Sequence, residues 1–152
     1  QQVLHALKYK QQPELGTMLG RLYGQDLVNA GYRQEFDLIV PVPLHASRRI
    51  VRGYNQSEEF GKGLSDILSA PCDDSLVTRA AMTSTQTRKT KLSRWENVSR
   101  VFEVVNNGML AGKRVLLVDD VMTTGATLEA CGHAILNAGC AQLSIACIAA
   151  TQ

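Results

Sequence analysis

Two adjacent carboxylates, Asp119 and Asp120, stand between an apolar run and a loop rich in hydroxyl groups and glycine. Carboxylate oxygens accept hydrogen bonds from ribose hydroxyls, and they are ligands that Mg2+ prefers. The following loop, Thr123–Thr127, offers backbone N–H groups and hydroxyls where a helix is expected to start, which favours phosphate binding. The combination predicts a sugar phosphate site. Two solvated aspartates before an ordinary capped helix are the alternative, which leaves Gly125 and three threonines without a role.

The run Val115–Val118, directly before the carboxylates, predicts a central strand because it is apolar on both faces, as in parallel sheets. Ligands of such sheets bind at the carboxyl ends of the strands. We therefore expect both carboxylates at that edge of the sheet.

A second candidate segment follows another apolar stretch, Phe36–Val42, which also predicts a buried strand. The loop that begins at Pro43 should face the same crevice, and its N–H groups, together with Arg48, Arg49 and Arg52, suit a pyrophosphate. An exposed connection with solvated arginines is the alternative. The predicted pyrophosphate-binding residues are Pro43, Leu44, His45, Ala46, Ser47 and Arg48, although a single His near a loop is more often structural.

A third candidate segment is basic. Six basic residues and one acid lie between Arg79 and Arg100. Within it, residues 83–91 are polar and lack apolar periodicity, so we expect a flexible loop with Arg88, Lys89 and Lys91 as its functional cations. Such a loop can close over a polyphosphate and neutralise a leaving group. The same charge suits a nucleic-acid backbone or a solvated surface.

Length and composition indicate one domain of 152 residues, with a helical part at about 1–35 and a core at about 36–152. The contents of 45% hydrophobic and 20% charged residues are typical of a soluble globular protein. No apolar run approaches the length of a membrane span, and no secretory pattern is seen, so we expect a cytoplasmic protein without membrane contact. The four cysteines form no C-x-x-C pair and are expected to be reduced.

Periodicity and capping residues predict the secondary structure. Helices are expected over Val3–Lys10, Glu14–Asn29 (with apolar residues at helical spacing), Asn55–Ser69, a short segment after Ser93, and Thr127–Ala138. Strands are expected over Phe36–Val42, Leu76–Arg79, Val101–Val105, Arg114–Asp119 and Leu143–Ala149, with a turn at Asn106–Gly108. This alternation predicts a three-layer α/β fold with a largely parallel central sheet.

Five stretches in order resemble the ComF/GntX family of phosphoribosyltransferase-like proteins. They are Leu7–Lys10, Val40–Leu44, Arg52–Gln56, the spaced Gln86, Leu92, Arg94 and Asn97, and Val115–Leu128. The resemblance implies the type I phosphoribosyltransferase fold and the use of phosphoribosyl pyrophosphate (PRPP) with Mg2+. It implies ribose and metal binding, and hence catalysis, by Asp119 and Asp120. It also implies 5-phosphate binding by Thr123, Thr124, Gly125, Ala126 and Thr127.

Two departures from the family pattern affect what is expected. Family members commonly begin with a cysteine-rich segment that is missing here, and we therefore expect a truncated chain. Relatives that act on 6-oxopurines usually have Asp at the position of Thr123, so this residue argues against that substrate class.

Two functional hypotheses follow. The first is Mg2+-dependent transfer of phosphoribose from PRPP to a nitrogen nucleophile, with release of pyrophosphate. The second is a PRPP or nucleotide sensor, or an adaptor in DNA uptake by competent bacteria that binds single-stranded DNA or a partner protein. Family analogy alone suggests a homodimer.

Overall fold

The central element is a parallel sheet of three strands, β1 (Leu38–Pro41), β4 (Arg114–Met122) and β5 (Gln142–Ala150), in the order β1-β4-β5. The structure is a computed structural model that describes residues 12–80 and 101–151. The register aligns Val40 with Leu117 and Leu117 with Ile145. The predicted α/β fold with a parallel central sheet is confirmed.

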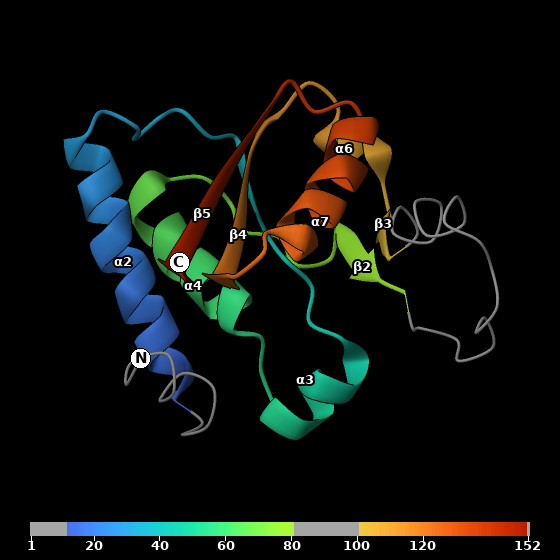
Figure 1. Ribbon diagram of the computed structural model, residues 1–152. Helices are drawn as coiled ribbons and strands as arrows, with labels where there is room; N and C mark the ends of the chain where they lie inside the picture. Colours follow the sequence, from blue (N-terminus) through green and yellow to red (C-terminus); the bar gives the residue numbers. More distant parts are fainter. Residues whose placement is uncertain (1–11, 81–100, 152) are drawn as a thin grey trace, which may run out of the picture.

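Helices cover both faces of this sheet (Figure 1). The described helices are α2 (Pro13–Asn29), α3 (Ala46–Arg52), α4 (Gln56–Leu68), α6 (Asn107–Leu110) and α7 (Ala126–Asn137). α4 lies on one face with α2 outside it, and α7 lies on the other face. Beside α7, β2 (Val77–Arg79) and β3 (Phe102–Val104) form a separate antiparallel pair.

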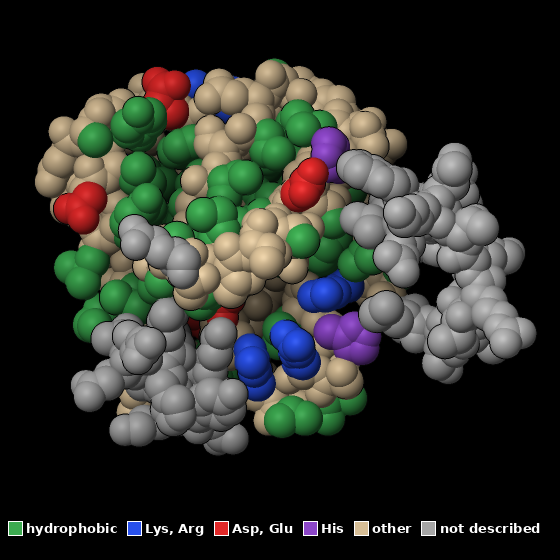
Figure 2. Space-filling view, viewed as in Figure 1, with side chains coloured by type: hydrophobic (Ala, Val, Ile, Leu, Met, Phe, Trp, Pro, Cys, Tyr) green, Lys and Arg blue, Asp and Glu red, His purple; other side chains and the backbone are tan. Residues whose placement is uncertain are grey.

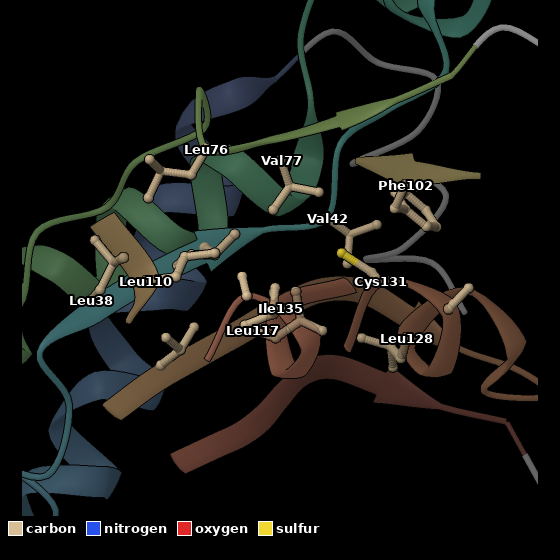
Figure 3. Packing of buried hydrophobic residues seen from close by; sticks show 14 residues of the cluster. Leu38, Val42, Leu76, Val77, Phe102, Leu110, Leu117, Leu128, Cys131 and Ile135 are labelled. Atoms are coloured by element: carbon tan, nitrogen blue, oxygen red, sulfur yellow. The ribbon is translucent and has the colours of Figure 1, made fainter. Parts of the chain in front are cut away.

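The buried apolar residues of β4 contribute alternately to two hydrophobic cores. Val115 and Leu117 of β4 join the core under α7, with Leu128 and Ile135 of that helix (Figure 3). The intervening Leu116 joins the core under α4, as does Val118. Because successive strand side chains point to opposite faces, burial on both faces explains the uninterrupted apolar run.

Glycines make the contact between α2 and α4. The buried residues of α2 are Gly16, Gly20 and Gly24. A Cβ atom on Gly20 would lie 2.2 Å from the Phe60 carbonyl oxygen, and one on Gly63 would lie 2.1 Å from the Thr17 carbonyl oxygen. The two helix backbones therefore touch directly. Apolar side chains of α2 pack only in part, since Met18 and Leu22 are 50% and 60% exposed.

Three of the differences from prediction have a clear local cause. β4 continues to Met122 because β5 keeps pairing with it, so both carboxylates lie within the strand. The connection after Pro43 contains the helix α3, which His45 caps by accepting a hydrogen bond from the Ser47 N–H. The predicted turn at Asn106 is instead the start of α6, because the side chain of Asn106 accepts from the Gly108 N–H at 3.0 Å.

One further prediction is confirmed, and others concern residues outside the described ranges. Asn55 caps α4 as predicted, whereas Glu58 forms ion pairs with Arg49 and Lys62. The helices predicted at 3–10 and after residue 93, and the loop at 83–91, lie outside the described residues. In the part of the chain that is described, none of the helices has the length and apolar character of a membrane span.

Candidate functional site

A cavity of about 200 Å³ opens at the carboxyl ends of β1 and β4. Its walls come from the β1–α3 connection, the start of α4, the end of β2, and the β4–α7 loop. The lining residues are Val42, Pro43, Leu44, Arg48, Arg52, Asn55, Gln56, Ser57, Arg79, Asp119, Asp120, Val121, Thr123 and Thr127.

The different lengths of neighbouring strands bring the two carboxylates to this cavity. β1 ends at Pro41, opposite Val118, and the next residue, Val42, donates its N–H to the Val118 oxygen at 2.9 Å. β4 then runs on beside β5 alone. Asp119 and Asp120 therefore emerge just past the end of β1, at the edge where the sequence predicts them.

Asp119 is a buried carboxylate, 9% exposed, with one oxygen held by two donors. Its Oδ1 accepts from the Ser57 hydroxyl at 2.8 Å and from the Asp120 N–H at 2.9 Å. Burial and, to a lesser extent, the negative charge of Asp120 raise the pKa of Asp119 to about 6, against the lowering effect of the hydrogen bond from Ser57. The negative charge of Asp119 is thus less favourable in the folded protein than that of an exposed carboxylate.

The β4–α7 loop leaves the start of α7 open. Gly125 is the N-cap residue and adopts the left-handed conformation, with φ of 79°, which favours glycine. No side chain of the described residues caps the helix; Ala126 N–H lies 3.4 Å from the Thr124 hydroxyl oxygen, a long hydrogen bond. The exposed Thr123 and Thr127 line the cavity. This geometry suits an anion at the helix N-terminus.

The start of α4 forms a wall that the site prediction omitted. Asn55, Gln56 and Ser57 are 3%, 1% and 3% exposed, although all three are polar. From the sequence, Arg52 is expected to suit a pyrophosphate and Asn55 to start a helix, whereas Gln56 and Ser57 have no predicted role in the site. Three polar residues at a predicted helix start are equally typical of an exposed cap, so burial was not readable from the sequence.

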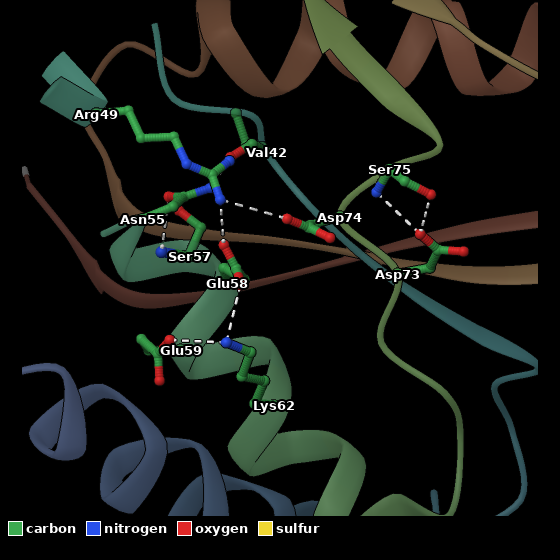
Figure 4. A network of polar contacts seen from close by, with 10 residues as sticks. All are labelled: Val42, Arg49, Asn55, Ser57, Glu58, Glu59, Lys62, Asp73, Asp74 and Ser75. Carbon is green, nitrogen blue, oxygen red and sulfur yellow. Dashed lines mark hydrogen bonds and ion pairs between the residues drawn. The ribbon is translucent and has the colours of Figure 1, made fainter. Parts of the chain in front are cut away.

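Three arginines surround the cavity: Arg48, Arg52 and Arg79. The Arg79 guanidinium carbon lies 5.3 Å from the centre of the Phe102 ring, a cation–π distance. Basic side chains gather on the surface between α3 and the sheet (Figure 2). Arg49 instead binds Glu58 at 3.4 Å and Asp74 at 3.7 Å, which ties α3 to its neighbours (Figure 4).

The remaining predicted site residues lie near the cavity or outside the described residues. Within the described ranges, Thr124, Gly125 and Ala126 form the turn below the lining threonines but are not lining residues themselves. His45, Ala46 and Ser47 belong to the start of α3, and His45 acts there as a helix cap. Arg88, Lys89 and Lys91 lie outside the described residues.

Comparison with known proteins adds three findings. The family model "Phosphoribosyl transferase domain" matches residues 8–152. DNA utilization protein YhgH of Escherichia coli (strain K12) is 32% identical over 152 residues, covering 98% of this chain and 66% of that protein. Competence protein F of Haemophilus influenzae is 30% identical over 147 residues, covering 94% of this chain and 64% of that protein. The chain therefore spans about two thirds of the length of these relatives.

Among solved structures, the chain resembles glutamine PRPP amidotransferase from B. subtilis complexed with ADP and GMP. The TM-score is 0.68 at 17% identity, and the match covers 95% of this chain and 30% of that chain. At this identity the likeness concerns the fold alone.

Proposed function

Because the chain belongs to the phosphoribosyl transferase domain family, we propose that its cavity binds PRPP and that the protein transfers phosphoribose to a nitrogen nucleophile. The predicted resemblance to the ComF family is confirmed by the match to competence protein F. The observation that carries the proposal is the arrangement of charge in the cavity, where arginines and an open helix N-terminus surround two carboxylates.

The arginines supply positive charge that the described residues do not neutralise. Neither Arg48 nor Arg79 has an acidic partner within ion-pair distance among residues 12–80 and 101–151. Arg52 donates to the Gln56 side-chain oxygen at 3.2 Å rather than to a carboxylate. Guanidinium groups bind phosphate oxygens through paired N–H donors. The pyrophosphate of PRPP is a suitable occupant beside Arg48 and Arg52.

The open start of α7 supports a second anionic subsite. Thr123 and Thr127 place hydroxyls at the cavity wall, next to helix N–H groups without a side-chain cap. Arg79 lies on the side of the cavity next to α7, because Phe102, whose ring contacts the Arg79 guanidinium, packs in the core under α7. A 5-phosphate at this end would place the ribose between the two anionic groups, beside the carboxylates.

Asp119 and Asp120 fit the ribose and a Mg2+ ion. Asp119 is a suitable oxygen ligand because both of its hydrogen bonds within the described residues go to Oδ1. No buried side-chain oxygen among those residues lacks a partner. Asp119 itself lines the cavity, and Oδ2 is the oxygen that neither the Ser57 hydroxyl nor the Asp120 N–H binds. A Mg2+ held there with PRPP oxygens would neutralise charge on the departing pyrophosphate.

The proposed reaction breaks the bond between the anomeric carbon and the pyrophosphate oxygen, whose electron pair leaves with the pyrophosphate. The nitrogen lone pair forms the new bond to carbon, and a proton on that nitrogen passes to solvent. Positive charge on the ribose in the transition state is stabilised by the nearby carboxylates. Arg48 and Arg52 stabilise the leaving group.

Calorimetric titration of PRPP with Mg2+ tests this proposal. The wild type is compared with Asp119→Asn/Asp120→Asn and with a matched control, Asp26→Asn/Asp66→Asn, which removes two exposed carboxylates from α2 and α4. We expect binding to the wild type and the control, and a loss of about 100-fold or more in the site variant. A folded wild type that does not bind PRPP would overturn the proposal.

A bound PRPP would then allow the transfer step to be examined. Pyrophosphate release is measured with a panel of free bases and amines, with the Asp119→Asn/Asp120→Asn variant as the blank. Release that depends on one nucleophile identifies the acceptor. PRPP binding without release for any nucleophile would favour a sensor over a transferase.

A second candidate function is binding of single-stranded DNA. Relatives that carry the names DNA utilization protein and competence protein F favour it, as do the exposed Arg48 and Arg49 of α3. Phosphate-driven binding weakens steeply with salt. We expect the fluorescence anisotropy of a labelled oligonucleotide to rise with protein at low salt, and Arg48→Gln/Arg49→Gln to weaken this binding. Binding that is absent or insensitive to salt would exclude this candidate.

A further inference from the structure

The buried polar residues of the described chain all lie in one place. They are Asn55, Gln56, Ser57 and Asp119, and each of them lines the cavity. Burial of a polar group is unfavourable unless its hydrogen bonds are satisfied. Three of these residues are consecutive at the start of α4, a helix that could cap itself at the surface without burying them. We therefore expect these buried polar residues to have a role in the site.

Asn55 joins the start of α4 to the end of β1. Its side-chain oxygen accepts from the Ser57 N–H at 3.2 Å, and its amide nitrogen donates to the Val42 oxygen at 3.0 Å (Figure 4). Val42 is the last residue before the Pro43 connection and is itself bonded to β4 through Val118. Asn55 thus fixes where α4 stands relative to both strands.

Ser57 then contacts the carboxylate across the cavity wall. Its hydroxyl donates to Asp119 Oδ1 at 2.8 Å, and the Asp120 N–H occupies the same oxygen at 2.9 Å. With Oδ1 engaged twice, rotation of the carboxylate would break both bonds. The position of the other oxygen, Oδ2, is thereby fixed on a residue that lines the cavity.

We propose that Ser57 is a positioning residue, which holds the Asp119 carboxylate so that Oδ2 faces the ribose or its metal ion. The proposal rests on the function proposed above for this cavity. Asn55 places Ser57, and Ser57 orients the carboxylate that contacts the ligand. A group that only stabilised α4 would not need its hydroxyl aimed at a residue 62 positions away.

The test compares Ser57→Ala with Ser57→Thr, which keeps the hydroxyl, and with Ser65→Ala, a serine on the same helix away from the cavity. PRPP affinity in the presence of Mg2+ is measured by calorimetry. We expect Ser57→Ala to weaken binding about 10-fold, the usual scale for a residue that orients a ligating carboxylate. Ser57→Thr restores most of the affinity, and Ser65→Ala leaves it unchanged.

A double-mutant cycle distinguishes a positioning role of Ser57 from a purely structural one. In an Asp119→Asn background, Ser57→Ala should have little further effect on PRPP affinity, because the group that it orients is gone. Equal effects of Ser57→Ala in both backgrounds would overturn the proposal. So would unchanged affinity of Ser57→Ala in the wild-type background.

Crystal structures of the ligand-free variants separate this inference from the proposed function. We expect the Asp119 carboxylate to turn in Ser57→Ala and to keep its orientation in Ser57→Thr. If the wild type fails to bind PRPP, the proposed function falls, and this orientation alone decides whether Ser57 holds Asp119. An unchanged carboxylate in Ser57→Ala would overturn the inference.

Discussion

Two helices, α4 and α7, begin at the same edge of the sheet and at the same cavity, yet their first turns differ. At the start of α4, Asn55 caps the helix with its own side chain and lies buried. At the start of α7, Gly125 has no side chain to offer, and the threonines around it are exposed. One helix end is closed by protein groups, and the other is open.

The difference separates two uses of a helix N-terminus. At a closed end, a protein side chain accepts a hydrogen bond from a helix N–H group, so that the helix end holds neighbouring segments of the chain in place. An open end offers the same donors to a ligand. Because a closed and an open helix start lie side by side at the cavity, α4 can hold the Asp119 carboxylate while α7 binds a phosphate. Four predictions test whether the two ends differ in this way.

The largest expected effect comes from placing a carboxylate at the open end. Ala126→Asp puts a negative charge in the first turn of α7, which stabilises the helix by about 0.3–1 kcal/mol. The same charge repels a 5-phosphate, and we expect affinity for ribose 5-phosphate and PRPP to fall about 100-fold, or about 3 kcal/mol. Calorimetry and thermal unfolding report the two opposite effects. Ala126→Asn is the neutral control, and tighter or equal binding by Ala126→Asp would place the phosphate elsewhere.

The next effect concerns the closed end. Asn55→Ala removes the cap of α4 and leaves the Val42 oxygen without its donor, so we expect a loss of about 2 kcal/mol in the free energy of unfolding. Urea unfolding measures this loss. The matched variant at the open end is Thr124→Ala, which removes only the long bond from the Ala126 N–H. Similar losses in the two variants would show that the ends do not differ.

A third prediction uses pH to test the carboxylate that α4 holds. Because the pKa of Asp119 is raised from 3.8 to about 6, its charged form disfavours the folded state above pH 6, and this cost disappears as the pH falls toward 4. Ligand-free Asp119→Asn should therefore be more stable than the wild type at pH 7.5 by about 1–2 kcal/mol.

Urea unfolding of both proteins at pH 7.5 and pH 4.5 checks this prediction. The advantage of the variant should shrink at the lower pH, where the wild-type carboxyl is protonated in the folded state. Carboxyl groups distant from Asp119 titrate alike in both proteins and cancel in the comparison. An advantage of equal size at both pH values would mean that burial does not raise the Asp119 pKa.

The smallest effect is expected at the surface, where α3 is tied to α4. Arg49→Gln removes exposed ion pairs to Glu58 and Asp74, and such pairs contribute about 0.2–1 kcal/mol. We expect little change in unfolding and none in PRPP affinity, whereas Arg48→Gln should weaken pyrophosphate binding. Calorimetry with pyrophosphate compares the two. A stronger effect of Arg49→Gln on binding would reverse the assignment of these neighbouring arginines.

Local sequence patterns were sufficient to predict much of the fold and the open start of α7. The apolar run before Asp119 predicted β4, and the residues after Asp120 predicted the loop that opens α7. Both depend on neighbours along the chain, because side-chain alternation and helix capping act over a few residues. The end of β4 was predicted too early, since strand length depends on how far β5 continues beside it.

The sequence by itself determined the order of the five strands and of α2, α4 and α7, the position of the two carboxylates at the carboxyl edge of the sheet, and the glycine at the start of α7. Tertiary structure decided that Ser57 meets Asp119, that Arg79 enters the cavity from β2, and that α2 packs through its glycines. These contacts join segments far apart in the chain. Their geometry depends on sheet register and on helix packing, which no local pattern of residues specifies.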